Sequence, residues 1–191
     1  LADRDAHQIL KCDTEGEWLM SLGTRYKAAM QDPFNHPSDT AVAPSGEIYI
    51  SDGYGNSCIH RFTAAGEHID TFGSPGSGPG QFRVPHSLRV AKDGRIYVCD
   101  RENHRVQVFS PEGQFLDQWT DFKFPMGIHI DDNQIVYVTD QVPRLSIYTL
   151  EGELLARGRT FENCHNVYTD SRGYIYGVDT ANQRVQKFAK V

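Results

Sequence analysis

Short runs of alternating hydrophobic and polar residues follow one another along the whole chain, and the same succession returns about every 40 to 50 residues. The most regular run is rich in aromatic and β-branched residues and ends in Asp, as at 48–52, 96–100, 136–140 and 175–179. Such runs are typical of β-strands, because these side chains pack well on a pleated surface. Signs of helices are nearly absent, so the pattern predicts an all-β fold.

The aspartates that end these runs measure the period of the repeat. Asp52, Asp100, Asp140 and Asp179 are separated by 48, 40 and 39 residues. Units of this length, with about four strands each, are typical of propeller blades. The sequence therefore predicts a β-propeller of four-stranded blades, and the longest interval is explained by a loop rich in Gly and Pro at 74–81. Because the aspartates recur in every unit, we expect them to accept turn hydrogen bonds.

The repeat divides the chain into five units, which cover approximately 1–33, 34–81, 82–121, 122–160 and 161–191 of a single domain. The first unit is half present and the last lacks its fourth strand, so we expect about four to five blades. Incomplete blades at both ends leave unpaired strand edges. The chain also has no initiator Met and begins within a repeat, so we expect it to be a piece of a larger ring.

Composition narrows the classes of partner. The chain carries 19 Lys and Arg against 25 Asp and Glu, and these charges are spread evenly. No basic stripe is available to neutralise phosphates, so nucleic acid is not an expected partner. The sequence contains no run of 18 apolar residues, which predicts a soluble protein with no membrane segment. Four widely spaced cysteines without a C-x-x-C pair favour the cytoplasm, although an N-terminal signal lost upstream remains an alternative.

Two histidines occupy one register position of the repeat. His86 and His165 each come directly before the innermost strand of a blade. Equivalent positions in a propeller encircle the channel at the same height, so residues far apart in sequence can meet around one ion. A catalytic zinc needs about three protein ligands and one open place. The alternative is that both imidazoles are ordinary polar residues lining the channel.

A tyrosine and an arginine follow the aromatic strands of two successive units. Tyr54 comes after Gly53, which allows the chain to bend sharply at the end of the strand. Arg101 stands at the equivalent turn of the next unit. The phenol is a candidate base if a nearby metal ion and guanidinium favour its ionised form. The alternatives are a packing or hydrogen-bonding role for Tyr54 and a salt bridge of Arg101 with Glu102 or Asp100.

Several stretches resemble the NHL repeat and, within that class, the peptidyl-α-hydroxyglycine α-amidating lyases. They are found at 35–42, 51–57, 80–88 and 100–103. The resemblance implies a six-bladed propeller that holds zinc on three histidines in its channel, with a structural calcium nearby. It also implies cleavage of the carbon–nitrogen bond of a peptide ending in α-hydroxyglycine, which releases the peptide amide and glyoxylate.

The matching motifs identify the positions in this chain that correspond to the family's functional residues. The resemblance implies that His86 and His165 are zinc ligands, with the third ligand expected upstream of residue 1. It makes Tyr54 the catalytic tyrosine and Arg101 the arginine beside it. Where the family's last zinc motif has Pro-His-Asp, this chain has Cys-His-Asn at 164–166. Four further residues are expected to support the site: Asp39, Asp52, Asn103 and Asn166.

Two functions of different classes remain open. The first is a zinc-dependent lyase that acts on peptidyl-α-hydroxyglycine-like substrates, either peptides or small molecules. The second is a non-catalytic propeller that binds a protein or carbohydrate at its rim, because a fold does not fix a function. A calcium-dependent lactonase would need acidic channel ligands, whereas the register positions offer Ser38, His86, Met126 and His165.

Overall fold

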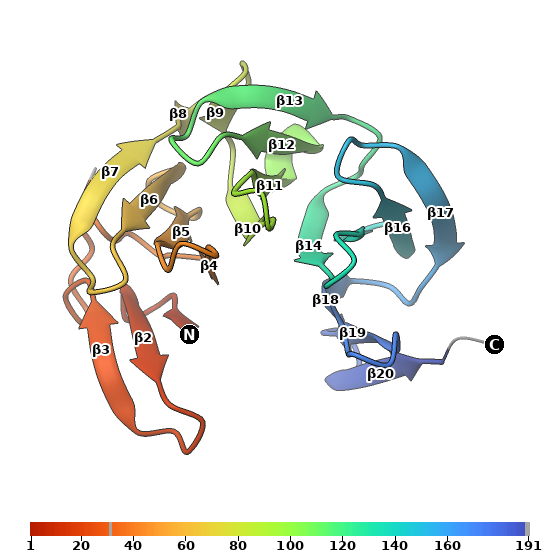
Figure 1. Ribbon diagram of the computed structural model, residues 1–191, viewed down its shortest axis with the longest axis horizontal. Coiled ribbons are helices and arrows are strands. Elements are labelled where there is room, and N and C mark those ends of the chain that lie inside the picture. The colour runs from red at the N-terminus through yellow and green to blue at the C-terminus, as the bar shows by residue number, and fades with distance from the viewer. Residues whose placement is uncertain (31, 190–191) are drawn as a thin grey trace.

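The computed structural model describes residues 1–30 and 32–189. They form five antiparallel sheets that follow one another around an arc, like the blades of a propeller (Figure 1). The predicted all-β propeller is confirmed. The one helical element of the described residues is a 3₁₀ turn, η1, at Arg101–Asn103. No helix among those residues is long and apolar enough to cross a bilayer.

The blades are numbered here in chain order. Blade 1 contains β1 (Ala2–Asp3), β2 (Gln8–Cys12) and β3 (Trp18–Leu22), and blade 2 contains β4 (Asp39–Val42), β5 (Ile48–Asp52), β6 (Cys58–Phe62) and β7 (His68–Phe72). Blade 3 contains β10 (Pro85–Val90), β11 (Ile96–Asp100), β12 (Arg105–Phe109) and β13 (Phe115–Trp119). Blade 4 contains β14 (Pro125–Ile130), β15 (Val136–Asp140), β16 (Arg144–Tyr148) and β17 (Leu154–Arg159), and blade 5 contains β18 (Cys164–Thr169), β19 (Ile175–Asp179) and β20 (Arg184–Phe188).

Within each blade the strands are ordered from the centre of the arc outwards. In Figure 1, β4, β10, β14 and β18 lie on the inner side, whereas β7, β13 and β17 form the outer edge. Neighbouring inner strands contact one another, β4 with β10, β10 with β14 and β14 with β18. Residues at equivalent positions of successive inner strands are therefore neighbours in space, which is the condition for a site shared between blades.

The hydrophobic core lies between the blades. The second strand of blade 3, β11, is buried at every position because its two faces are covered by the adjacent blades. One apolar cluster joins Tyr49 and Ile59 of blade 2 to Val98 and Phe109 of blade 3. Each such side chain contributes about 1.5–3 kcal/mol when it is fully buried. Packing between blades therefore fixes the orientation of neighbouring blades and the position of their inner strands relative to one another.

The aspartates at the ends of the second strands hold the turns together, as predicted. The Asp100 carboxylate accepts hydrogen bonds from the backbone N–H of Arg83, the Asn103 amide and the Arg105 guanidinium, each at 2.8 Å. Asp52 is buried in the same way and accepts bonds from the Asn35 N–H. These carboxylates connect the turn after each strand to the chain that enters the blade.

The insert at 74–81 is more ordered than the predicted loop. Its ends form a short parallel pair, β8 (Ser74–Pro75) with β9 (Gln81–Phe82). The buried Arg105 guanidinium donates to the carbonyls of Gly78 and Gln81, and the Asn103 amide donates to that of Gly76. The polar side chains of blade 3 thus supply the hydrogen bonds that the Gly- and Pro-rich sequence cannot make by itself.

The Asp100–Arg105 pair gives a test of this fold. Asp100→Ala leaves a buried guanidinium without its carboxylate, so we expect it to lower the free energy of unfolding by about 3–5 kcal/mol. Urea denaturation measures this loss. The control is Asp93→Ala, which removes a carboxylate that is 44% exposed and paired with Arg95 at a surface turn. Equal losses in the two variants contradict the role given to Asp100.

Candidate active site

Three inner strands carry a β-bulge at the same place. The register between inner and second strand shifts between Pro85 and Ser87 in blade 3, and equivalent shifts occur at 125–127 in blade 4 and at 164–166 in blade 5. A bulge leaves one residue unpaired and re-aims its side chain. The bulged residues are His86, Met126 and His165, and all three line one cavity of about 60 Å³.

The two imidazoles lie next to each other in this cavity. The ring centroids of His86 and His165 are 4.8 Å apart, and the ring planes are inclined at 69°. Nδ1 of His86 donates a hydrogen bond to the Met126 carbonyl at 2.7 Å. Because a carbonyl only accepts, this bond places the proton on Nδ1 and leaves the lone pair on Nε2. A histidine whose second nitrogen is fixed in this way is prepared to bind a metal.

Burial keeps both imidazoles neutral. The pKa of His86 is lowered to about 4, mainly by burial and also by the neighbouring His165 and Arg101, against the opposing effects of the Met126 hydrogen bond and Asp39. Burial also lowers the pKa of His165, and Arg101 acts in the same direction. A neutral imidazole is the form that binds metals. The pair is therefore available to an ion at neutral pH without first losing a proton.

Tyr54 meets His86 because two blades approach closely. A Cβ added at Gly53 would lie 2.2 Å from the Pro85 carbonyl oxygen, so only glycine permits this contact. The Ser38 hydroxyl donates to the same oxygen at 2.8 Å. The Tyr54 ring consequently stands edge-on to His86, with 5.9 Å between the centroids. The predicted tyrosine and histidine thus come together from different blades.

Two guanidinium groups flank the phenol, and sequence reasoning found only one of them. The Arg101 and Arg4 guanidinium carbons each lie 5.5 Å from the Tyr54 ring centroid. Arg101 also forms the predicted ion pair with Glu102, at 2.9 Å. A signal for Arg4 existed in the repeat, because Arg4 follows Asp3 as Arg101 follows Asp100.

The four supporting residues divide into two pairs. Asp39 and Asn166 line the cavity, and the Asp39 carboxylate accepts from the Ser87 hydroxyl at 2.5 Å and from Arg89 at 2.8 Å. Asp52 and Asn103 instead belong to the hydrogen-bonded turns at the ends of β5 and β11. They support the segments that carry Tyr54 and Arg101.

A different trio within residues 1–30 and 32–189 has its donor atoms within 4.8 Å of one another: Asp52, Cys58 and His60. His60 Nε2 lies 3.2 Å from Asp52 and 3.5 Å from the Cys58 sulfur, so these groups already contact one another. Burial, assisted by Asp52, raises the pKa of the Cys58 thiol to about 12. A thiol that stays protonated is a poor metal ligand. This trio is therefore a structural cluster of blade 2.

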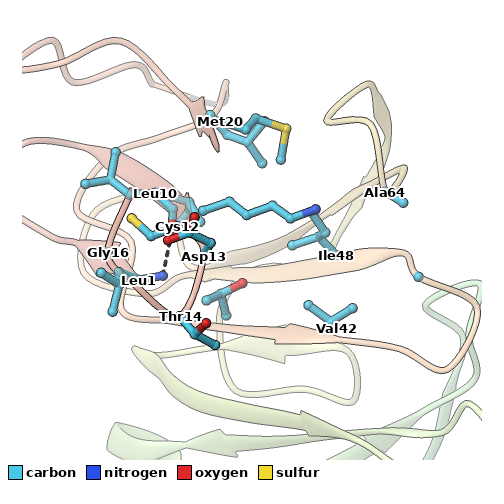
Figure 2. Close-up of a pocket in the computed structure, with 15 residues that line it drawn as sticks. Leu1, Leu10, Cys12, Asp13, Thr14, Gly16, Met20, Val42, Ile48 and Ala64 are labelled. Carbon is cyan, nitrogen blue, oxygen red and sulfur yellow. Dashed lines mark hydrogen bonds between the residues drawn. The ribbon is translucent and has the colours of Figure 1, made fainter. Parts of the chain in front are cut away.

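A larger apolar pocket of about 570 Å³ lies between blades 1 and 2. Figure 2 shows Leu10 and Met20 facing Val42 and Ile48 across it, with Cys12 at one side. Its lining residues include no histidine. The pocket is therefore separate from the candidate active site.

Comparison with known proteins agrees with the repeat. The NHL repeat model matches residues 34–62 and 82–109. A probable peptidyl-α-hydroxyglycine α-amidating lyase of Caenorhabditis elegans, pgal-1, is 40% identical over 92% of this chain and 56% of its own length. Peptidyl-glycine α-amidating monooxygenase B of Xenopus laevis is 32% identical over 99% of this chain. The chain is an NHL-repeat protein similar to these α-amidating lyases.

The comparisons also set the extent of this similarity. The chain spans about a quarter of the Xenopus protein, 24% of its length. Human NHL repeat-containing protein 3 is 34% identical to this chain, and the match covers 59% of this chain and 34% of the human protein. A streptogramin B lyase structure superposes with a TM-score of 0.69 over 98% of this chain and 63% of that one, at 14% identity. That likeness concerns the propeller fold alone.

His129 shows what burial does to a histidine outside the cavity. It lies on β14, and its Nε2 is 2.9 Å from the Thr169 hydroxyl. Its pKa is lowered to about 4, mainly by burial and also by Arg89, against the opposing effects of Asp131 and Asp132. Above pH 6.5 the imidazole is neutral in both the folded and the unfolded state. As the pH falls from 6.5 towards 4, the unfolded chain takes up a proton that the folded protein does not, so the free energy of unfolding decreases.

His129→Gln tests this dependence with a side chain that does not titrate. Between pH 7 and pH 5 we expect the free energy of unfolding of the variant to fall by about 2 kcal/mol less than that of the parent. Urea denaturation at the two pH values measures the difference. His68→Gln, on the outer strand β7, is the control. An unchanged pH dependence in His129→Gln refutes the assignment.

Proposed function

We propose that the protein is a zinc-dependent lyase that cleaves the carbon–nitrogen bond of peptidyl-α-hydroxyglycine-like substrates to give an amide and glyoxylate. The observation that carries the proposal is the meeting of His86, His165 and Tyr54 at one point between blades. Relatives named as α-amidating lyases support it. A peptide or a small molecule with the same terminal group is the proposed substrate.

The donor set suits zinc. His86 and His165 offer two buried, neutral imidazole nitrogens, and tetrahedral zinc binds such nitrogens at about 2.0–2.1 Å. In this proposal the third ligand comes from a segment upstream of residue 1. When bound, the ion supplies Lewis acidity that makes a substrate hydroxyl easier to deprotonate. The calcium site implied by the family resemblance stays a prediction.

Tyr54 acts as the proton acceptor in this proposal. The ionised Tyr54 oxygen takes the proton of the substrate hydroxyl. The electron pair left on the substrate oxygen forms the carbonyl of glyoxylate, and the bonding pair of the C–N bond leaves on the amide nitrogen, which takes the proton back from Tyr54. Arg101 stabilises the negative charge that develops beside the ring. The step requires no nucleophile from the protein.

The alternative is a non-catalytic propeller. It is favoured by the human relative, which is named only for its NHL repeats. A protein or carbohydrate partner at the rim belongs to that alternative and stays a prediction. The two functions differ in whether the protein releases glyoxylate, and therefore in whether Tyr54 and His86 have a catalytic role.

An assay of glyoxylate release from a peptide ending in α-hydroxyglycine tests the lyase in the full-length protein. Removing the proposed base in Tyr54→Phe is expected to lower kcat by about 10²–10⁴-fold. His86→Ala is expected to abolish bound zinc together with turnover. Tyr26→Phe, which alters a tyrosine that is 70% exposed, serves as the control. Undiminished release in both site variants refutes the proposal.

Arg4 gives a finer test of the same site. A partly exposed guanidinium over an aromatic ring contributes about 0.5–1 kcal/mol, so Arg4→Leu is expected to lower kcat about two- to fivefold through misplacement of Tyr54. Arg172→Leu is a matched control, because Arg4 pairs with Asp5 as Arg172 pairs with Asp170, and the Arg172 guanidinium carbon lies 5.1 Å from the Tyr174 ring centroid. Equal activity in the two variants removes Arg4 from the site.

A further inference from the structure

Tyr54 is tied through its backbone to the segment that enters blade 2. Its N–H donates to the His36 carbonyl at 3.4 Å. The next residue approaches the same segment closely, because a Cβ added at Gly55 would lie 2.3 Å from the Asn35 side chain. The position of the Tyr54 ring beside His86 therefore depends on where residues 35 and 36 are held.

His7, in the turn that follows β1 of blade 1, holds this segment in place. Its Nδ1 accepts the His36 N–H at 3.1 Å. A backbone N–H only donates, so Nδ1 of His7 carries the lone pair and the ring proton is on Nε2. His7 is 8% exposed, and its ring stands edge-on to the His36 ring with 4.3 Å between the centroids. His7 thus contacts both the backbone and the side chain of His36.

The other attachment of the segment is to blade 2 itself. Nδ1 of His36 donates to the side-chain oxygen of Asn35 at 2.8 Å. The Asn35 N–H in turn donates to both oxygens of the buried Asp52 carboxylate. Asp52 therefore fixes residue 35 relative to blade 2, whereas His7 fixes residue 36 relative to blade 1. Removing the His7 imidazole releases the second of these two attachments.

The same link recurs between blades 3 and 4, where it carries no residue of the proposed lyase. Nδ1 of His104 accepts the Phe124 N–H at 3.1 Å, and the two ring centroids lie 4.3 Å apart. The Phe124 carbonyl then accepts the Gln141 N–H at 3.2 Å. Both histidines have a left-handed backbone, with φ of 57° at His7 and 56° at His104. The two links therefore differ in what they carry, which is Tyr54 in the first and Gln141 in the second.

We infer that His7 is a positioning residue for Tyr54, which it aligns through the His36 backbone. The Arg4 guanidinium carbon, in the same turn, lies 5.5 Å from the Tyr54 ring centroid, so blade 1 reaches this tyrosine through its ring as well as its backbone. A general base must stay within hydrogen-bond reach of the proton that it takes, so a small displacement of the phenol slows the transfer. An effect on turnover rests on the proposed function, whereas an effect on the position of the ring does not.

Replacement of His7 by glycine in the full-length protein tests this role. His7→Gly removes the acceptor, and glycine adopts the left-handed backbone of this position without strain. We expect kcat for glyoxylate release to fall about two- to tenfold with KM unchanged, the loss expected from one hydrogen bond. His7→Asn is expected to restore most of this loss, because asparagine tolerates the same φ and its amide oxygen can replace Nδ1. His104→Gly, which removes the matching bond between blades 3 and 4, is the control and is expected to leave kcat unchanged.

The ¹⁹F resonance of 3-fluorotyrosine placed at position 54 reports on the ring without turnover. We expect it to shift in His7→Gly, to return to the parent position in His7→Asn and to stay unchanged in His104→Gly. A shift specific to His7→Gly in a protein that releases no glyoxylate supports the positioning role and refutes only the lyase. An unchanged resonance in His7→Gly, or equal losses of kcat in His7→Gly and His104→Gly, overturns the positioning role and leaves the lyase standing.

Discussion

The close approach of neighbouring inner strands is the constraint on which the site depends. A Cβ at Gly127 would lie 2.6 Å from the Asn166 Cα, and one at Gly53 would lie 2.2 Å from the Pro85 carbonyl oxygen. Glycine at position 127 lets the bulges of blades 4 and 5 meet, and glycine at position 53 lets blade 2 approach the bulge of blade 3. The two imidazoles share one cavity and the Tyr54 ring stands beside His86 for this reason, although the three side chains come from different blades.

Burial gives this meeting point its chemistry. Desolvation keeps His86 and His165 neutral, and one backbone hydrogen bond selects the tautomer of His86. The charged groups are held at the margin, with Asp39 on Arg89 and Arg101 on Glu102. The cavity thus has imidazole lone pairs inside it and guanidinium groups at its margin, which is the arrangement that the proposed metal site requires.

Much of the fold was readable from the sequence because each blade is a local unit. The Asp52, Asp100 and Asp179 markers gave the period, and their turn hydrogen bonds follow from it. Equivalence of register likewise predicted that His86 and His165 would meet. The repeat in the sequence does not reveal a bulge, however, because the unpaired residue is recognised only from the pairing of the inner strand with the second strand. Arg4 was missed although it follows Asp3 as Arg101 follows Asp100.

The central claim is that His86 and His165 hold one ion together. Zinc binding by the full-length protein, its His86→Ala and His165→Ala variants and the double variant tests this most directly. We predict one zinc per parent chain, and a double variant that binds no more weakly than either single variant, because each substitution alone dismantles the site. Independent, additive losses from the two substitutions, or a parent protein that binds no zinc, would contradict the account.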